Sequence, residues 1–166
     1  PWPRADVVVG NPPFLGVSKK RRELRADYFD ALNHVYGQQV PGAADLVCYW
    51  FAKSLAYISA QRLNAAGFVS TNSIRGGANR RVLDAIVEHS QIFDAWSDET
   101  WVNEGAAVRV SLVCFGAGSG TQLNGEEVHS ILPDLTAVLG EGLAIDLSSA
   151  KAQPGDRKST RLNSSH

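Results

Sequence analysis

The chain has 166 residues, of which 44% are apolar and 20% are charged, and its formal net charge is −1. These values are ordinary for a globular protein of about one domain. They exclude a basic field over the whole surface, so any contact with nucleic acid depends on a local patch. No apolar run is long enough to span a bilayer and no signal peptide opens the chain, which predicts a cytoplasmic protein without a membrane partner.

The predicted elements alternate between strands and helices. The apolar run 5–10 indicates a buried strand, and a charged loop or helix start follows it. The later elements are, in chain order, a helix at 23–36, a helix at 45–63 capped by Asp45, a strand at 67–72, a helix at 79–87 capped by Asn79, and strands at 92–96 and 108–115.

This order predicts an α/β fold with a mostly parallel sheet, one antiparallel strand and helices on both faces. We assign residues 1–118 to one unit. Residues 119–155 carry only a weak strand near Glu127–Ile131 and are expected to begin a following, truncated segment.

The cysteines and histidines predict neither a metal site nor a disulfide. Cys48 and Cys114 lie far apart in apolar contexts, and the four histidines show no spacing typical of metal ligands. We expect both cysteines to be reduced thiols of the core.

Both ends of the chain predict a piece of a larger protein. The chain contains no methionine and opens with Pro1-Trp2-Pro3, almost directly on a strand. Residues 156–166 read DRKSTRLNSSH, a polar run that resembles the translation of a sequencing adapter. We expect this run to be an artefactual, disordered tail.

The first strand leads directly into Asn11-Pro12-Pro13-Phe14, at the sheet edge where ligands of open α/β sheets bind. The two prolines lack N–H groups and restrict the backbone dihedral angles. We therefore expect the backbone carbonyls of this segment to face a ligand instead of bonding to neighbouring residues. The Asn11 carboxamide adds an acceptor. Two acceptors on an aromatic amine return electron density to its nitrogen and ease attack on an electrophilic methyl group, while Phe14 can stack on the ring. The alternative is a plain strand-terminating turn.

These four residues match the catalytic motif Asn/Asp-Pro-Pro-aromatic, and the chain resembles class I S-adenosylmethionine-dependent DNA methyltransferases that act on the exocyclic amino group of adenine. It is most similar to the large MmeI-like branch, in which methylation is often fused to restriction. Further blocks agree in order with that branch at 44–51, 70–80, 95–99 and 105–112.

The resemblance implies the C-terminal half of a Rossmann-like methyltransferase core from a bacterial or archaeal restriction–modification or phage-defence enzyme. The implied reaction is methyl transfer from S-adenosylmethionine to N6 of an adenine flipped out of double-stranded DNA. Asn11 and the Pro12 carbonyl would hold the amino group, beside Pro13, and Phe14 would stack on the base.

The family's glycine-rich donor motif, the acidic partner of the donor ribose and the target recognition domain have no counterpart in this sequence. We expect them on the remainder of the parent polypeptide. Whether that polypeptide also contains a nuclease domain is left open by the sequence. No cofactor-binding residue is therefore assigned, and the fragment is expected to be inactive alone.

Six polar side chains are candidates for contact with DNA, four after the catalytic motif, one at the end of the strand at 67–72 and one after it. A basic cluster suits phosphates, but a solvated charged loop is the commoner meaning of such a run, and surface charge is the default for an isolated arginine. The candidates are Lys19, Lys20, Arg21, Arg22, Asn72 and Arg75.

Two other functions remain open. The motif also serves enzymes that methylate glutamine side chains or guanine in ribosomal RNA, although the blocks around Trp50 and Arg75 do not suit those compact enzymes. The other alternative is a methyltransferase relic that only holds nucleic acid. An intact donor motif on the parent polypeptide would favour an enzyme, and a degenerate one the relic.

Overall fold

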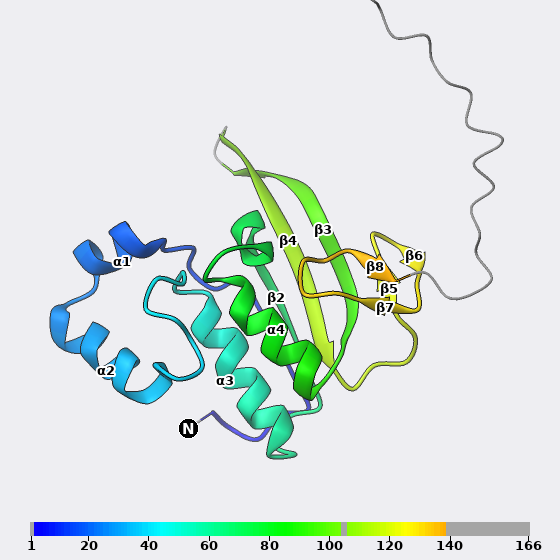
Figure 1. Ribbon diagram of the computed structural model, residues 1–166, viewed down its shortest axis with the longest axis horizontal. Coiled ribbons are helices and arrows are strands. Elements are labelled where there is room, and N and C mark those ends of the chain that lie inside the picture. The colour runs from blue at the N-terminus through cyan, green and yellow to red at the C-terminus, as the bar shows by residue number, and fades with distance from the viewer. Residues whose placement is uncertain (1, 104–105, 139–166) are drawn as a thin grey trace, which may run out of the picture.

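The computed structural model describes residues 2–103 and 106–138, so the expected tail at 156–166 lies outside the described residues. A layer of helices lies against a sheet (Figure 1). The elements are β1 (Val7–Gly10), α1 (Val17–Glu23), α2 (Ala26–Tyr36), α3 (Cys48–Ser59), β2 (Ala65–Thr71), the 3₁₀ helix η1 (Asn72–Arg75), α4 (Arg80–His89), β3 (Ile92–Asn103), β4 (Ala106–Gly116), β5 (Gln122–Leu123), β6 (Glu126–Glu127), β7 (Ser130–Ile131) and β8 (Ala137–Val138).

The main sheet has six strands in the order β1-β2-β4-β3-β5-β6. β1 runs parallel to β2, while β4 lies between β2 and β3 and runs antiparallel to both. β5 is parallel to β3, and the two-residue β6 is antiparallel to β5. Four of the six strands therefore share one direction. This confirms the predicted α/β fold with a mostly parallel sheet, to which β6 adds a second, short antiparallel strand.

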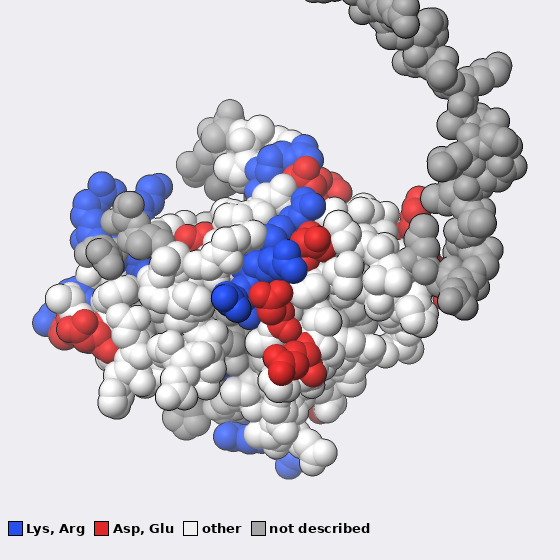
Figure 2. All heavy atoms as spheres, in the orientation of Figure 1, with Lys and Arg blue, Asp and Glu red and all other residues white. Residues whose placement is uncertain are grey.

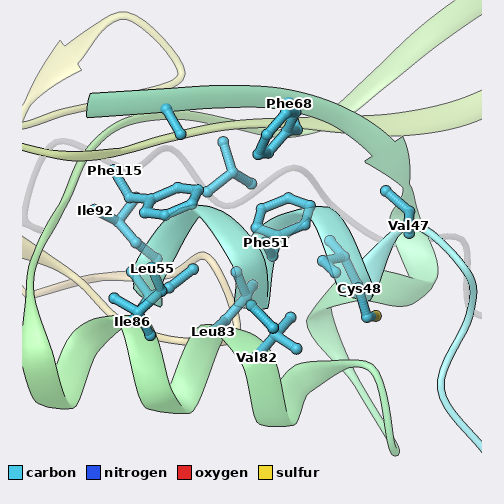
Figure 3. Packing of buried hydrophobic residues seen from close by; sticks show 14 of the residues in the cluster. Val47, Cys48, Phe51, Leu55, Phe68, Val82, Leu83, Ile86, Ile92 and Phe115 are labelled. Atoms are coloured by element: carbon cyan, nitrogen blue, oxygen red, sulfur yellow. The ribbon is translucent and has the colours of Figure 1, made fainter. Parts of the chain in front are cut away.

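The core lies between this sheet and the helices α3 and α4. In α3, Cys48, Phe51 and Leu55 share one face because they are spaced three and four residues apart. The Phe51 ring stacks on Phe115 of β4 at 5.6 Å between centroids and meets Phe68 of β2 edge-on at 5.2 Å (Figure 3). The α4 side chains Val82, Leu83 and Ile86 close the cluster from the other side (Figure 3).

The opposite face of the sheet is open at β1. Successive side chains of a strand point to opposite faces, so Val8 packs on the core while Val7 and Val9 are 54% and 80% exposed. The helical layer that we expected on this second face is not formed by the residues that the structure describes.

β3 is longer than the predicted strand 92–96. Its register shifts between Trp96 and Glu99, and pairing with β4 then continues to Asn103. The polar run Ser97–Thr100 is typical of a loop, but a β-bulge of this kind bends a strand without ending it. The resulting β3–β4 hairpin projects past the sheet at the end where η1 lies (Figure 1).

Residues after Gly118 continue the same structure. β5 pairs with β3, and Ile131 and Leu135 are buried in the shared core. The sequence-based boundary at residue 118 thus falls between two strands of one sheet. The weak strand expected near 127–131 corresponds to the short strands β6 and β7.

Candidate active site

Asn11-Pro12-Pro13-Phe14 lies at the carboxyl end of β1, beside the carboxyl end of β2. Gly10, the last residue of β1, is level with Phe68, and β2 continues three residues further to Thr71. η1 begins there with Asn72. The parallel pairing therefore brings the predicted catalytic turn and the Asn72–Arg75 segment to the same edge of the sheet, as the sequence indicated.

The turn presents two free acceptors. Pro12 is buried, Asn11 and Pro13 are exposed, and Phe14 is half-buried. Leu15 donates its N–H to the Pro13 carbonyl over 3.1 Å. Neither the Asn11 carboxamide nor the Pro12 carbonyl takes a hydrogen bond from any residue that the structure describes. Both groups are available to a ligand.

The four basic residues after the turn do not form one surface cluster. Lys19 and Arg22 are exposed, and Arg22 lies 3.6 Å from Glu23. The Arg21 side chain lies outside the described part of the chain. Lys20 is fully buried, whereas both interpretations of this basic run, a DNA contact and a solvated loop, required an exposed side chain.

Lys20 is directed into the protein. Its Nζ donates to the carbonyl oxygens of Ala44 over 2.6 Å and Gly42 over 3.3 Å. The same ammonium lies 5.2 Å from the Phe29 ring centroid and 5.3 Å from that of Tyr49. Because the expected contact with DNA needs an exposed ammonium, we leave Lys20 out of the candidate DNA surface.

Asn72 and Arg75 are held by bonds within the protein. The Asn72 amide donates to Asp98 over 2.5 Å and accepts from the Ser111 hydroxyl over 2.7 Å. Arg75 donates to the backbone carbonyls of Asp134 over 2.9 Å and Ser97 over 3.4 Å. These bonds tie η1 to β3, β4 and the loop before β8.

Asp98 and Arg109 form an exposed pair at the base of the β3–β4 hairpin. Their charged atoms approach to 2.5 Å, and Arg109 also donates to Thr100 over 2.9 Å. The hydrogen bond from Arg109 holds the pKa of Asp98 below its ordinary value. The carboxylate is thus kept charged and engaged at the sheet edge.

A shallow cavity of about 540 Å³ opens at this same edge. Its wall runs through η1 and the turn into α4, where Gly77 has a φ of +56° that favours glycine. The wall is formed by Ala43, Asn72, Ser73, Arg75, Gly76, Gly77, Ala78, Asn79 and Asp134.

Basic side chains gather on this side of the molecule. Figure 2 shows them over α1 and in a band from the β3–β4 hairpin across η1 to the start of α4, with acidic groups alongside. Arg80 pairs with Asp84 over 3.2 Å, as Arg109 does with Asp98. Lys19 and Arg81 have no ion pair with a described residue, so their charges remain uncompensated.

Comparisons with known proteins decide the family. The family model "MmeI, DNA-methyltransferase domain" matches residues 4–127. This chain belongs to the MmeI DNA-methyltransferase family. DNA methyltransferase A of Bacillus subtilis (strain 168) is 30% identical over 151 residues, which cover 86% of this chain and 17% of that protein.

A solved MmeI structure shares the fold. The Type IIL restriction–modification enzyme MmeI, solved in complex with DNA, matches with a TM-score of 0.62 and 28% identity over 79% of this chain and 19% of that one. The chain therefore spans about a fifth of the length of these two proteins, and its elements form part of a methyltransferase fold.

The MmeI-family domain offers no thiol nucleophile or metal cluster in its described part. Burial raises the pKa of Cys48 to about 12 and also raises that of Cys114. Within residues 2–103 and 106–138, no group of His, Cys, Asp or Glu side chains could hold a metal ion. No helix of these residues has the length and apolar character needed to cross a membrane.

Two residues of this site had another interpretation from the sequence. Asp45 and Asn79 were expected to cap helices. α4 does begin directly after Asn79, as predicted, whereas α3 begins only at Cys48, and neither side chain makes a capping bond. Their side chains bond to each other instead. Local sequence does not indicate this bond, because the two residues lie 34 positions apart.

Proposed function

We propose that this chain holds the target base in an enzyme that methylates the N6 amino group of adenine in DNA, with S-adenosylmethionine as the methyl donor. The observation that carries this proposal is a pair of acceptors to which no described residue donates, the Asn11 carboxamide and the Pro12 carbonyl, at a sheet edge of an MmeI-family domain. The parent would be a cytoplasmic restriction–modification or phage-defence enzyme of a bacterium or archaeon.

The role of the chain's own residues follows from the chemistry of an aromatic amine. Its lone pair is delocalised into the ring, so it is a poor nucleophile. Asn11 and Pro12 each accept one hydrogen of the amino group, which returns electron density to the nitrogen. The nitrogen lone pair would then form the bond to the methyl carbon as the sulfur–methyl bond of the donor breaks, with its electron pair left on the sulfur of S-adenosylhomocysteine, and the surplus proton would leave toward these acceptors and solvent.

A base inside a duplex cannot reach this turn, so the proposal includes a flipped adenine. Phe14 is half-buried and keeps part of its ring accessible for stacking on the base. Pro13 is exposed next to it and stiffens the turn. Lys19 and Arg22, which are exposed on α1, would contact phosphates of the same duplex, with Arg21 beside them.

Asn72 and Arg75 fit an indirect role better than direct contact with DNA. Their polar atoms bond to Asp98, Ser111, Ser97 and Asp134. These bonds hold the wall of the cavity at the sheet edge. A direct contact with DNA would require Asn72 or Arg75 to exchange some of them.

The methyl donor supplies an electrophilic methyl group when bound. The described residues fit the acceptor side of the reaction, but Gly76-Gly77 before α4 is not part of a G-x-G-x-x-G turn, and no other described turn between a strand and a helix has this donor-binding pattern. We therefore assign no residue of this chain to S-adenosylmethionine and expect its site on the remainder of the parent polypeptide.

The test is to identify the methylated product. The whole parent polypeptide is incubated with isotopically labelled S-adenosylmethionine and unmethylated genomic DNA, ribosomal RNA or total protein, and digests are analysed by mass spectrometry. We expect label in N6-methyladenine from DNA. Label in guanine of RNA or in glutamine would favour the other methyltransferases, and DNA binding without any transfer would favour the relic.

A further inference from the structure

We infer that Asn79, together with Asp45, is a positioning residue that holds the catalytic turn against the end of β2. This inference rests on the proposed function, because it assigns the pair a role in the same reaction. Neither side chain touches the turn itself.

Asn79 is 7% exposed and uses its whole carboxamide. Its Oδ1 accepts the Asp45 backbone N–H over 2.7 Å and the Cys48 thiol over 3.5 Å. Its Nδ2 donates to Asp45 Oδ2 over 2.7 Å and to Ser73 Oγ over 3.0 Å. The oxygen of this buried amide thus accepts two hydrogen bonds and its nitrogen donates two. An amide with all of its hydrogen-bonding positions occupied holds its partners in one arrangement.

Asp45 and Ser73 extend this network across the sheet edge. Ser73 Oγ donates to Asp45 Oδ2 over 2.9 Å and lies 2.6 Å from Thr71 Oγ1, at the last residue of β2. The network therefore joins three separate parts of the chain, which are the end of β2 with η1, the start of α4, and the segment before α3.

The segment before α3 is in turn bonded to the residues after the catalytic turn. The Leu46 N–H donates to the Leu15 carbonyl over 2.9 Å. Lys20 Nζ donates to the Ala44 carbonyl over 2.6 Å. A Cβ placed on Gly16 would lie only 3.4 Å from Asp45 Oδ1. Residues 44–46 thus contact Leu15, Gly16 and Lys20 on one side and Asn79 on the other.

Leu15 directly follows Phe14, so a shift of residues 44–46 is passed to the catalytic turn within one residue. Displacement of a reacting group by about 1 Å can cost about 100-fold in rate. Substrate binding depends on other contacts, so loss of Asn79 should lower kcat more than it weakens binding.

The experiment compares Asn79→Ala with Asn64→Ala in the whole parent polypeptide. Asn64 is an exposed asparagine just before β2, and its side chain makes no hydrogen bond with a described residue. We expect Asn79→Ala to lower kcat about 100-fold, with the Kd for DNA and donor changed by no more than about twofold. Asn64→Ala should behave as the unmodified protein.

A second variant separates positioning from general destabilisation. The double exchange Asp45→Asn with Asn79→Asp keeps one carboxylate and one amide at the same two places, and we expect it to recover most of the lost kcat. An unchanged kcat in Asn79→Ala, or a double exchange no more active than Asn79→Ala, would overturn the inference.

Hydrogen–deuterium exchange provides a readout that needs no turnover. In Asn79→Ala we expect faster exchange at the Leu46 amide and in residues 15–20, not only around α4. Unchanged exchange there would overturn the positioning role even in an active enzyme. A parent polypeptide without any methyl transfer would instead contradict the proposed function, and the exchange data would still decide whether Asn79 holds the turn.

Discussion

At the scale of single residues, Lys20 shows how a charged side chain can be accommodated in the protein interior. A buried ammonium requires partners that replace water, and Lys20 has the Ala44 and Gly42 carbonyls and two aromatic rings. The run Lys19–Arg22 gives no sign of this, because four basic residues in sequence indicate a solvated surface. The partners come from 22 and 24 residues further along the chain.

We predict that Lys20→Met destabilises the fold while Lys19→Met does not. Lys20→Met removes a charged donor and leaves the buried Ala44 carbonyl without it, which should lower the free energy of unfolding by about 1–3 kcal/mol. Urea denaturation of the two variants measures the difference. Equal stability of both would contradict the burial of Lys20.

At the scale of elements, the β3–β4 hairpin depends on an ion pair near its base. The pKa of Asp98 is lowered first by the hydrogen bond from Arg109 and further by the charges of Arg109 and Arg75. A folded-state pKa below the unfolded value gives a contribution that is present above the unfolded pKa and lost as the pH falls through the folded pKa. The pair therefore persists at neutral pH and is lost only in acid.

We predict that Arg109→Gln raises the pKa of Asp98 toward its ordinary value. The main donor to this carboxylate is lost, while Asn72 still donates to it. Carbon-13 NMR titration of the Asp98 carboxyl group in both proteins measures the shift. An unchanged midpoint would show that Arg109 does not set it.

The elements also show where sequence patterns are sufficient. β1, β2, α4 and β4 follow from apolar period and length, and so does the place of residues 11–14 at the end of β1, whereas their catalytic role stays a prediction. The extension of β3 beyond residue 96 does not follow from the local pattern. Residues 97–100 are polar, and the strand continues there because Glu99 and Thr100 pair with β4. The Asp45–Asn79 pair had the right residues but the wrong partners, since capping is the only role that local sequence can indicate.

At the scale of the whole molecule, the parts of the candidate site gather at one end of the sheet. The candidate catalytic turn, η1, the cavity and the β3–β4 hairpin lie there, with Trp101 and Val102 exposed on the hairpin at 42% and 71%. Basic side chains accompany them on the same side (Figure 2). With a net charge of only −1, such local grouping is what a DNA-facing surface requires.

The family assignment accounts for this arrangement, since the MmeI methyltransferase model covers residues 4–127. The chain spans 17% of the Bacillus subtilis DNA methyltransferase A and 19% of the solved MmeI chain. Activity is accordingly a property to be measured on the whole parent polypeptide.

The most direct test of the central claim is the methylation rate of the parent polypeptide carrying Asn11→Ala, with Asn64→Ala as the matched control. Removal of one of two acceptors from the target amine should lower the rate of methyl transfer to adenine in duplex DNA by about 100-fold or more. The Kd for S-adenosylmethionine should stay within about twofold of that of the unmodified protein. A near-normal rate in the Asn11→Ala polypeptide would contradict the catalytic role of the turn.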